Sequence, residues 1–220
     1  MRRTLAIIGV GGHGRVVADI ARLNGYDVHF FDDDKSNKLS SGTVDEALKH
    51  KNMAFIVAIG DNETRMRITG RISDLGLQLA TLIHPRACIA SDAAIGPGTV
   101  VMANAVVNSG AAIGKGCIIN TSAVVEHDCR IDDFSHISVN STVAGTVSIG
   151  RLCFIGAGAT VINNISISDD VIIGAGAVVV EDIMERSTYI GVPARNIRNH
   201  FRGGDTEHIE FLPCLHPYAA

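Results

Sequence analysis

From residue 83 to residue 179, an aliphatic residue recurs at every sixth position without an insertion. A period of six matches neither an α-helix, which repeats its face about every 3.6 residues, nor a strand of alternating sides. It predicts a parallel β-helix, in which each six-residue unit supplies one strand and one corner and three units close a triangular coil. The seventeen members are Ile83, Ile89, Ile95, Val101, Val107, Ile113, Ile119, Val125, Ile131, Ile137, Val143, Ile149, Ile155, Val161, Ile167, Ile173 and Val179.

A small side chain stands two positions before most of these aliphatic residues. Cys117, Cys129 and Cys153 occupy this position, so we expect them to be compact apolar fillers of the interior. The chain has five cysteines, an odd number, and they form no C-x-x-C pair. This usage is typical of a reducing compartment, so we expect a cytoplasmic protein without a disulfide framework.

The composition narrows the class of protein further. Aromatic residues make up 5% of the chain and tryptophan is absent, which suits a narrow interior built on Ile, Val and Ala. The net charge of −4 argues against a general nucleic-acid binder, because no basic face is available to neutralise phosphates. No run of about 18 apolar residues predicts a membrane span. The apolar start after Arg2 and Arg3 is short and leads into a glycine-rich turn, so it indicates a buried first strand and not a signal peptide.

The part of the chain before the repeat follows a different period, that of a small α/β unit. Residues 4–10, 26–31 and 53–60 are apolar runs typical of parallel strands covered on both faces. The stretch after the first run carries apolar residues at helical spacing up to Gly25, and residues 62–79 also predict a helix. Strands and helices that alternate at short range predict a parallel sheet, here a small Rossmann-like βαβ unit.

The first predicted strand leads into the glycine-rich turn GVGGHG. Gly9, Gly11 and Gly14 are spaced as G-x-G-x-x-G, and Asp32 follows about 20 residues later. Taken alone, this spacing would indicate a dinucleotide cofactor. The unit is too small to contain the second mononucleotide half. The backbone N–H groups at a helix N-terminus bind the pyrophosphate of a sugar nucleotide equally well, and a turn that simply needs glycine is the alternative.

A polar cluster, VVEHDC, interrupts the apolar character of the repeat but keeps its register. His127 comes two positions after the inward Val125, so it belongs to a corner and points outward, above Ser109 and below Gly145 in its column of equivalent corner positions. A lone outward histidine is usually solvated, but here the carboxylate of Asp128 follows directly. An imidazole beside a carboxylate is suited to accept a proton at neutral pH. We expect three neighbouring acids to be solvated corner residues: Glu126, Asp132 and Asp133.

The hexad pattern, together with IGVPAR at residues 190–195, resembles the left-handed β-helix, or hexapeptide-repeat, acyltransferases. An N-terminal unit with GVGGHG, DDD and AIGDN, joined to a helix with EHDC and FSHISV, resembles more narrowly the bacterial sugar-nucleotide N-acetyltransferases of the PglD–NeuD type, which include enzymes of bacillosamine synthesis. The resemblance implies a nucleotide-sugar-binding domain at residues 1–82 and a left-handed β-helix acetyltransferase domain at residues 83–198. The remaining residues, 199–220, have no counterpart in the family and no assigned role.

The resemblance also implies roles for individual residues. His127 would be the general base, oriented and made more basic by Asp128, where family members often carry Glu. Gly145 would leave room for the thioester. The residues implied to bind the nucleotide sugar are Gly11, Gly12 and His13 at its phosphates and sugar, Asp32 and Asp33 at the uracil and ribose, and Gly60 at its backbone approach. The residues implied to contact acetyl-CoA are His136, Gly145, Ala157 and Ala175.

The activity implied is transfer of an acetyl group from acetyl-CoA to the 4-amino group of a UDP-linked amino-dideoxy sugar. The neutral amine attacks the thioester directly, so no nucleophilic serine or cysteine is needed, and we expect no metal. The resemblance implies a homotrimer with acetyl-CoA in the groove between neighbouring subunits. We expect neither a nucleic-acid partner nor membrane insertion.

Three alternatives stay open at this point. The same residues could carry O-acetylation of sialic acid or N-acetylation of a GDP-linked amino sugar such as perosamine, which an acceptor panel distinguishes. γ-type carbonic anhydrases share the β-helix and hold zinc with three histidines, and a metal assay tests that reading. Besides His127 and His136 this helix offers only His84 at its entrance, and a catalytic zinc needs three protein ligands. A non-catalytic trimeric scaffold would leave the glycine-rich turn unexplained.

Overall fold

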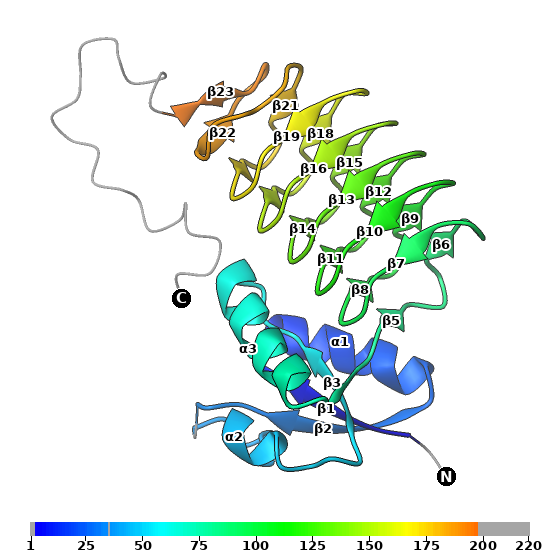
Figure 1. Cartoon of the computed structure of the whole chain (residues 1–220), viewed down its shortest axis with the longest axis vertical. Coiled ribbons are helices and arrows are strands. Elements are labelled where there is room, and N and C mark those ends of the chain that lie inside the picture. Colours follow the sequence, from blue (N-terminus) through cyan, green and yellow to red (C-terminus); the bar gives the residue numbers. More distant parts are fainter. Residues whose placement is uncertain (1–2, 35, 198–220) are drawn as a thin grey trace, which may run out of the picture.

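The computed structural model describes residues 3–34 and 36–197, so the predicted tail at 199–220 lies outside the described residues. Figure 1 shows an α/β unit at the N-terminal end and a stack of β-coils that rises from it. None of the helices in these described ranges is long and apolar enough to cross a membrane.

The N-terminal unit is a four-stranded parallel sheet with helices on both faces. Its strand order is β2-β1-β3-β4. Leu5 to Ile8 in β1 are fully buried because α1 covers one face of the sheet and α2 and α3 cover the other, as the continuous apolar runs predicted. The elements are β1 (Arg3–Ile8), α1 (Gly12–Leu23), β2 (Tyr26–Phe31), α2 (Val44–Ala47), β3 (Ala54–Val57), α3 (Asn62–Asp74) and β4 (Gln78–Leu79).

Two details of this unit differ from the sequence prediction. The helix predicted over residues 62–79 ends at Asp74, because Gly76 takes a φ of 65° that breaks the helix. The chain then forms β4, which pairs with β3. The short helix α2 was not predicted. Its four residues are too few to show a period, although Thr43 and Glu46 form a capping box at its start.

The rest of the described chain is a stack of short strands arranged in three sheets around a triangular prism, and all of their pairings are parallel except that of β22 with β23. The eight-stranded sheet holds β5 (Leu82–Ile83), β8 (Val100–Val101), β11 (Ile118–Ile119), β14 (His136–Ile137), β17 (Phe154–Ile155), β20 (Ile172–Ile173), β22 (Thr188–Ile190) and β23 (Arg195–Asn196). The six-stranded sheet holds β6 (Cys88–Ile89), β9 (Val106–Val107), β12 (Val124–Val125), β15 (Thr142–Val143), β18 (Thr160–Val161) and β21 (Val178–Val179). The five-stranded sheet holds β7 (Ala94–Ile95), β10 (Ala112–Ile113), β13 (Arg130–Ile131), β16 (Ser148–Ile149) and β19 (Ser166–Ile167).

The predicted aliphatic ladder forms the interior of the prism. Its fourteen members from Val101 to Val179 are each at most 4% exposed and pack in one cluster. Burial of each such side chain stabilises the fold by roughly 1.5–3 kcal/mol. The interpretation of the three cysteines as interior fillers is confirmed. Cys117, Cys129 and Cys153 are buried in the same cluster, and burial raises the pKa of the Cys117 and Cys153 thiols to about 12.

Each of the three corners recurs once per coil, so equivalent corner residues stack in columns. The turn from the six- to the five-stranded sheet carries His127 and Asp128, and we call it the His127 corner. The turn from the five- to the eight-stranded sheet includes Gly116, Phe134 and Leu152, and we call it the α3 corner. Residues in the left-handed region recur at both corners, among them Asp128 with a φ of 59°.

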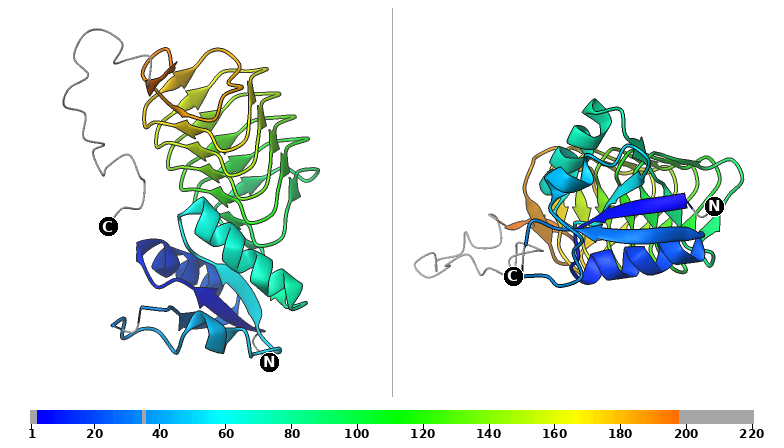
Figure 2. Two further views of the ribbon diagram at one scale, coloured as in Figure 1. Left: turned by 60° about the vertical axis from the view of Figure 1, so that its left-hand side comes forward. Right: turned by 90° about the horizontal axis from the view of Figure 1, so that it is seen from below.

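The N-terminal unit is fixed to one face of the prism. Val17 and Ala21 of α1 belong to the same apolar cluster as Val100, Met102 and Ile118 on the outer face of the eight-stranded sheet. Viewed from below in Figure 2, the α/β unit lies across the end of the prism. The outer face of the six-stranded sheet is not covered by any part of the chain that the structure describes.

The ladder predicts a sharp difference between two neighbours on β16. Ile149→Ala removes a side chain that is 1% exposed and leaves a cavity, so we expect the free energy of unfolding to fall by about 2–5 kcal/mol. Ser148→Ala changes an exposed position on the same strand and should alter it by less than about 0.5 kcal/mol. Urea unfolding followed by circular dichroism measures both, and equal effects would contradict an inward ladder.

Candidate active site

His127 and Asp128 form a hydrogen-bonded pair on the surface of the prism. Nδ1 of His127 lies 2.9 Å from Oδ2 of Asp128, and both side chains are more than half exposed in the single chain. A carboxylate only accepts, so Nδ1 carries the proton of this bond. In the neutral imidazole, Nε2 is then left with its lone pair. The pair has the arrangement of a general base with its orienting acid.

The backbone of the neighbouring coils fixes this pair. The Asp128 N–H donates to the Ser109 carbonyl one coil below, and the His127 carbonyl accepts from Thr146 N–H one coil above, at 3.0 and 2.9 Å. Glu126, expected to be a solvated corner residue, instead accepts from Asn108 Nδ2 at 2.9 Å. The carboxylate of Glu126 therefore links two coils beneath the histidine.

Gly145 creates the space into which the imidazole points. A Cβ added at Gly145 would lie 2.6 Å from Nε2 and 2.7 Å from Cε1 of His127. Real Cβ contacts do not approach this closely, so a larger residue would displace the ring tip or cover its lone pair. The predicted role of Gly145, room for the thioester, stays a prediction. The structure adds a second reason for glycine at this position, which is that it leaves the ring tip of His127 uncovered.

His136 lies at a different place, on the outer face of the eight-stranded sheet. The side chain points away from the interior as expected, but it is only 4% exposed. Phe154 on the next strand contacts its ring edge-on at a centroid distance of 5.0 Å. Burial, followed by the charges of Arg65 and His13, lowers the pKa of His136 well below its usual value. The predicted contact of His136 with acetyl-CoA stays a prediction. Only the small exposed part of the side chain could make it.

A hydrogen-bond chain fixes which nitrogen of His136 is protonated. Thr121 N–H donates to Oδ1 of Asn120 at 2.8 Å, so Nδ2 of Asn120 faces His136. This amide group lies 3.0 Å from Nε2 of His136 and can only donate. His136 is therefore neutral, with its acceptor nitrogen bound and its proton on Nδ1.

His13 stands at the first turn of α1, against the same region. Its Nε2 is buried and has no hydrogen-bond partner. Burial and the charge of Arg65 lower the pKa of His13 from 6.5 to about 4. A neutral imidazole with an unused buried nitrogen at a helix N-terminus is suited to a polar ligand group.

The glycines of the turn are of two kinds: one is required by close backbone packing, and two leave open space around them. A Cβ at Gly14 would lie 2.1 Å from the Gly9 carbonyl oxygen, so this glycine is needed for the approach of α1 to the turn. At Gly11 and Gly12 a Cβ would meet nothing within 4 Å. Gly11 is the N-cap of α1 and forms no side-chain cap. The two glycines predicted to meet the substrate phosphates are thus the two that leave the amino end of α1 accessible.

The acidic residues after β2 hold the glycine-rich turn and the start of α2 in place. Asp32 accepts from Val10 N–H at 2.9 Å and from Asp34 N–H at 3.0 Å. Asp33 accepts from Val44 N–H, at the start of α2, at 3.0 Å. The bond from Val10 places the Asp32 carboxylate beside the glycine-rich turn, whereas Asp33 is held at the amino end of α2. Their predicted contacts with ribose and uracil remain predictions.

The predicted acetyl-CoA positions Ala157 and Ala175 are exposed and stack one coil apart. They lie at the turn from the eight- to the six-stranded sheet, whereas His127 and Gly145 lie at the turn from the six- to the five-stranded sheet. The six-stranded sheet separates the two sets within one chain. One chain therefore does not bring all the predicted acetyl-CoA contacts to one edge of the prism.

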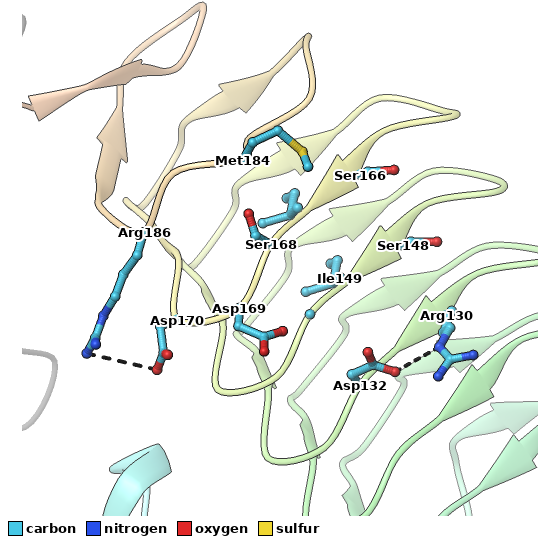
Figure 3. Close-up of a pocket in the computed structure, with 12 residues that line it drawn as sticks. Arg130, Asp132, Ser148, Ile149, Ser166, Ser168, Asp169, Asp170, Met184 and Arg186 are labelled. Carbon is cyan, nitrogen blue, oxygen red and sulfur yellow. Dashed lines mark hydrogen bonds and ion pairs between the residues drawn. The ribbon is translucent and has the colours of Figure 1, made fainter.

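An open cavity of about 590 Å³ lies elsewhere on the prism, over the five-stranded sheet and the α3 corner (Figure 3). Arg130 pairs with Asp132, and Arg186 with Asp170, at its edges. None of the predicted site residues lines this cavity. We therefore do not assign the predicted acetyl-CoA site to it.

Two polar residues of this region were not predicted. Arg65 is 1% exposed and lowers the pKa of both His13 and His136. A signal was present, because Arg65 shares a helical face with the apolar Ile68 and Ile72. Asn120 was not predicted either, since one polar residue at a corner is typical of any coil. In the part of the chain that the structure describes, no three His, Cys, Asp or Glu side chains gather in a group that could hold a metal ion.

Comparison with known proteins places this chain in a family. The PglD N-terminal domain model matches residues 4–72. The acetyltransferase domain of PglB from Neisseria gonorrhoeae FA1090 is 40% identical, with a TM-score of 0.85, over 89% of this chain and 100% of that one. The same domain is also known in complex with acetyl coenzyme A, at 40% identity and a TM-score of 0.85 over 90% of this chain and 100% of that one.

Two further relatives carry names that specify sugars. A mutant of the perosamine N-acetyltransferase from Caulobacter crescentus, in complex with CoA and GDP-perosamine, is 38% identical with a TM-score of 0.84 over 88% of this chain and 96% of that one. The UDP-N-acetylbacillosamine N-acetyltransferase of Bacillus subtilis (strain 168) is 37% identical over 108 residues, 44% of this chain. That match covers 50% of the length of the curated relative. The near-complete structural matches at 40% and 38% identity, together with the fold, show that the chain belongs to the left-handed β-helix acyltransferases, a family of enzymes.

Proposed function

We propose that this protein is an acetyl-CoA-dependent sugar N-acetyltransferase that acetylates the 4-amino group of a UDP-linked amino-dideoxy sugar. The observation that carries the proposal is the pair of His127 and Asp128, with Nδ1 engaged at 2.9 Å and Nε2 directed over Gly145. Two of the relatives are named as sugar N-acetyltransferases, and two are known in complex with acetyl-CoA or with CoA and GDP-perosamine. Both lines of support point to acyl transfer onto an amine.

The chemistry follows from the state of the imidazole. The amine nitrogen of the sugar attacks the thioester carbonyl carbon and forms a C–N bond. Nε2 of His127 takes the proton that the nitrogen loses, and Asp128 stabilises the imidazolium that results. The C–S bond breaks, and the CoA thiolate leaves and takes up a proton. The buried Cys117, Cys129 and Cys153 are unsuited to act as nucleophiles, because burial raises the pKa of each thiol.

The acceptor would be held by the N-terminal unit. Its phosphates would meet the open N–H groups of α1 at Gly11 and Gly12, where the helix dipole favours an anion. The unpartnered nitrogen of His13 would meet a polar group of the sugar. The base and ribose would lie beyond, near Asp32 and Asp33, whose carboxylates are held by backbone N–H groups.

The active site would require more than one copy of the chain. The N-terminal unit packs on the eight-stranded sheet, and the His127 corner is the edge of the prism opposite that sheet. A sugar nucleotide bound at Gly11 therefore belongs with the His127 of a neighbouring copy. We propose a homotrimer in which acetyl-CoA lies between the His127 corner of one copy and Ala157 and Ala175 of the next.

The surface for that assembly would be the six-stranded sheet. Its outer face is partly exposed in the single chain and carries only uncharged, β-branched side chains from β9 to β21. The exposed apolar residues Val139 and Ile162 lie at its two edges. The five-stranded sheet, in contrast, presents Arg130, Ser148 and Ser166 to solvent. The stacked residues of the six-stranded sheet are Val106, Val124, Thr142, Thr160 and Val178.

A GDP-linked amino sugar is the second candidate acceptor, because a perosamine N-acetyltransferase matches nearly the whole chain. The same base and the same donor groove would serve it, and only the nucleotide contacts would differ. A panel of UDP-, GDP- and CMP-linked amino sugars separates the candidates.

The first prediction concerns the base. With acetyl-CoA and the best acceptor of the panel, His127→Ala should lower kcat about 10²–10⁴-fold, because the proton acceptor is lost. Release of the CoA thiol measures the rate, and His50→Ala, at an exposed histidine of the N-terminal unit, serves as the control. Full activity of His127→Ala would contradict the mechanism, and no turnover of any amino sugar by the wild type would contradict the function.

The second prediction concerns the space beneath the imidazole. Gly145→Ala should lower kcat about 10–100-fold by displacing the ring tip, while the protein stays folded. Gly70→Ala is the matched control, since a Cβ there meets nothing within 4 Å. If both variants keep the wild-type kcat, Gly145 does not hold the base in place.

The third prediction concerns the sharing of sites between copies. A Cβ at Gly11 meets nothing within 4 Å, so the indole of Gly11→Trp should extend over the open amino end of α1 and block acceptor binding. Co-expression of His127→Ala with Gly11→Trp, followed by isolation of mixed trimers through two tags, should restore about a third of the sites, because each mixed trimer contains one productive pair of neighbours. Each restored site would take its histidine from one copy and its glycine turn from another. Mixed oligomers with no activity would place the whole site within one chain.

A further inference from the structure

Arg65 has all the hydrogen bonds that a guanidinium can donate. It is 1% exposed, in the second turn of α3. Five N–H groups point from its three nitrogens, and five oxygens accept from them. Nε donates to Gly116 O at 2.7 Å, Nη1 to Ile59 O and Gly60 O at 3.0 and 2.9 Å, and Nη2 to Asn62 Oδ1 and Phe134 O, each at 2.7 Å.

These acceptors come from both parts of the molecule. Ile59, Gly60 and Asn62 follow β3 in the N-terminal unit, whereas Gly116 and Phe134 belong to two successive coils of the α3 corner. A single planar side chain therefore joins the loop after β3 to the prism. The fork geometry of a guanidinium is rigid, so it fixes an orientation as well as a distance.

Asn62 extends this contact to a third coil. Its Nδ2 group donates to the carbonyls of Leu152 and Cys153, both at 3.0 Å, while its Oδ1 accepts from Arg65. Gly116, Phe134 and Leu152 occupy the same place in successive coils and share a left-handed φ, at 63°, 61° and 59°. The corner column thus presents its carbonyl groups to α3 in three consecutive coils.

The loop that Arg65 holds is part of the predicted acceptor site. Gly60 was expected to let the sugar nucleotide approach the backbone, and Arg65 binds its carbonyl group. His13 and His136 lie close enough that the charge of Arg65 lowers the pKa of both. Burial of a charged group is costly, and the five oxygens that accept from Arg65 offset this cost only while the loop after β3 and the two coils keep their places. The guanidinium therefore ties the position of this loop to the prism.

We propose that Arg65 is a positioning residue for the acceptor: with Asn62, it sets the glycine-rich side of the N-terminal unit at a fixed place on three coils, so that the sugar is held beside Gly60 and His13. The inference rests on the proposed function. It concerns acceptor placement, and it leaves the donor groove at Ala157 and Ala175 unaffected.

The test compares the KM for the amino sugar with the KM for acetyl-CoA. Arg65→Lys keeps the charge but supplies three donors in place of five, so we expect the KM for the amino sugar to rise about tenfold or more. The KM for acetyl-CoA should stay within about twofold of the wild type. Arg67→Gln, at an exposed arginine of the same helix, is the control and should change neither constant.

A second measurement does not depend on turnover. Arg65→Gln removes the charge, so the pKa of His136 and His13 should move upward, toward 6.5, because a nearby cation disfavours their protonated forms. NMR titration of the histidine ring signals, assigned with His13→Asn and His136→Asn, measures this shift. The milder variant Asn62→Ala should raise the acceptor KM, as Arg65→Lys does. Because it keeps the charge of Arg65, it should leave the pKa values of His13 and His136 unchanged.

Two results would overturn the inference. One is an acceptor KM within about twofold of the wild type in Arg65→Lys and Asn62→Ala. The other is an equal loss for both substrates, which would mean that Arg65 only stabilises the fold. If the wild type acetylates no amino sugar, the proposed function fails on its own. The histidine titrations in Arg65→Gln then still decide whether Arg65 acts on His13 and His136.

Discussion

The closure of each coil around an inward aliphatic residue is the constraint on which the rest of this molecule depends. Because every sixth side chain must fill the interior, each residue between 83 and 179 has a fixed sheet or corner and a fixed coil. Equivalent residues of successive coils are then in contact. His127 and Gly145 meet for this reason, as do the three carbonyl groups that α3 contacts. The repeat places outward residues with little freedom, which is what a catalytic group requires.

The second determinant is the attachment of the N-terminal unit to one sheet of the prism. Apolar contacts of α1 and the buried fork of Arg65 hold the glycine-rich turn, with His13, against the eight-stranded sheet. The same attachment leaves the His127 corner on the opposite edge. The uncharged outer face of the six-stranded sheet lies between the predicted acetyl-CoA positions, Ala157 and Ala175, and the predicted base, His127. Assembly through that face would complete a site that a single chain leaves divided.

The sequence predicted the repeat, the interior cysteines and the three main strands of the α/β unit, because each depends on a period that is regular over many residues. It did not predict the end of the helix at Asp74 or the short helix α2, which depend on one glycine and one capping box. For His127 the register placed the side chain on the outside correctly. For His136 the register was also correct, but its burial comes from a domain contact that no local pattern encodes. Arg65 and Asn120 were missed for the same reason, since the partners that define their roles lie on other coils or in the other part of the molecule.

The central claim is that acetyl transfer takes place at His127 between two copies of the chain. The most direct measurement is a crystal structure of the protein with CoA and a nucleotide-linked 4-amino sugar. We predict that the amine nitrogen lies within hydrogen-bond distance of His127 Nε2 of one copy, while the phosphates lie at Gly11 and Gly12 of its neighbour. A sugar nucleotide whose phosphates and amine both contact residues of one chain, or an amine far from His127, would contradict the account.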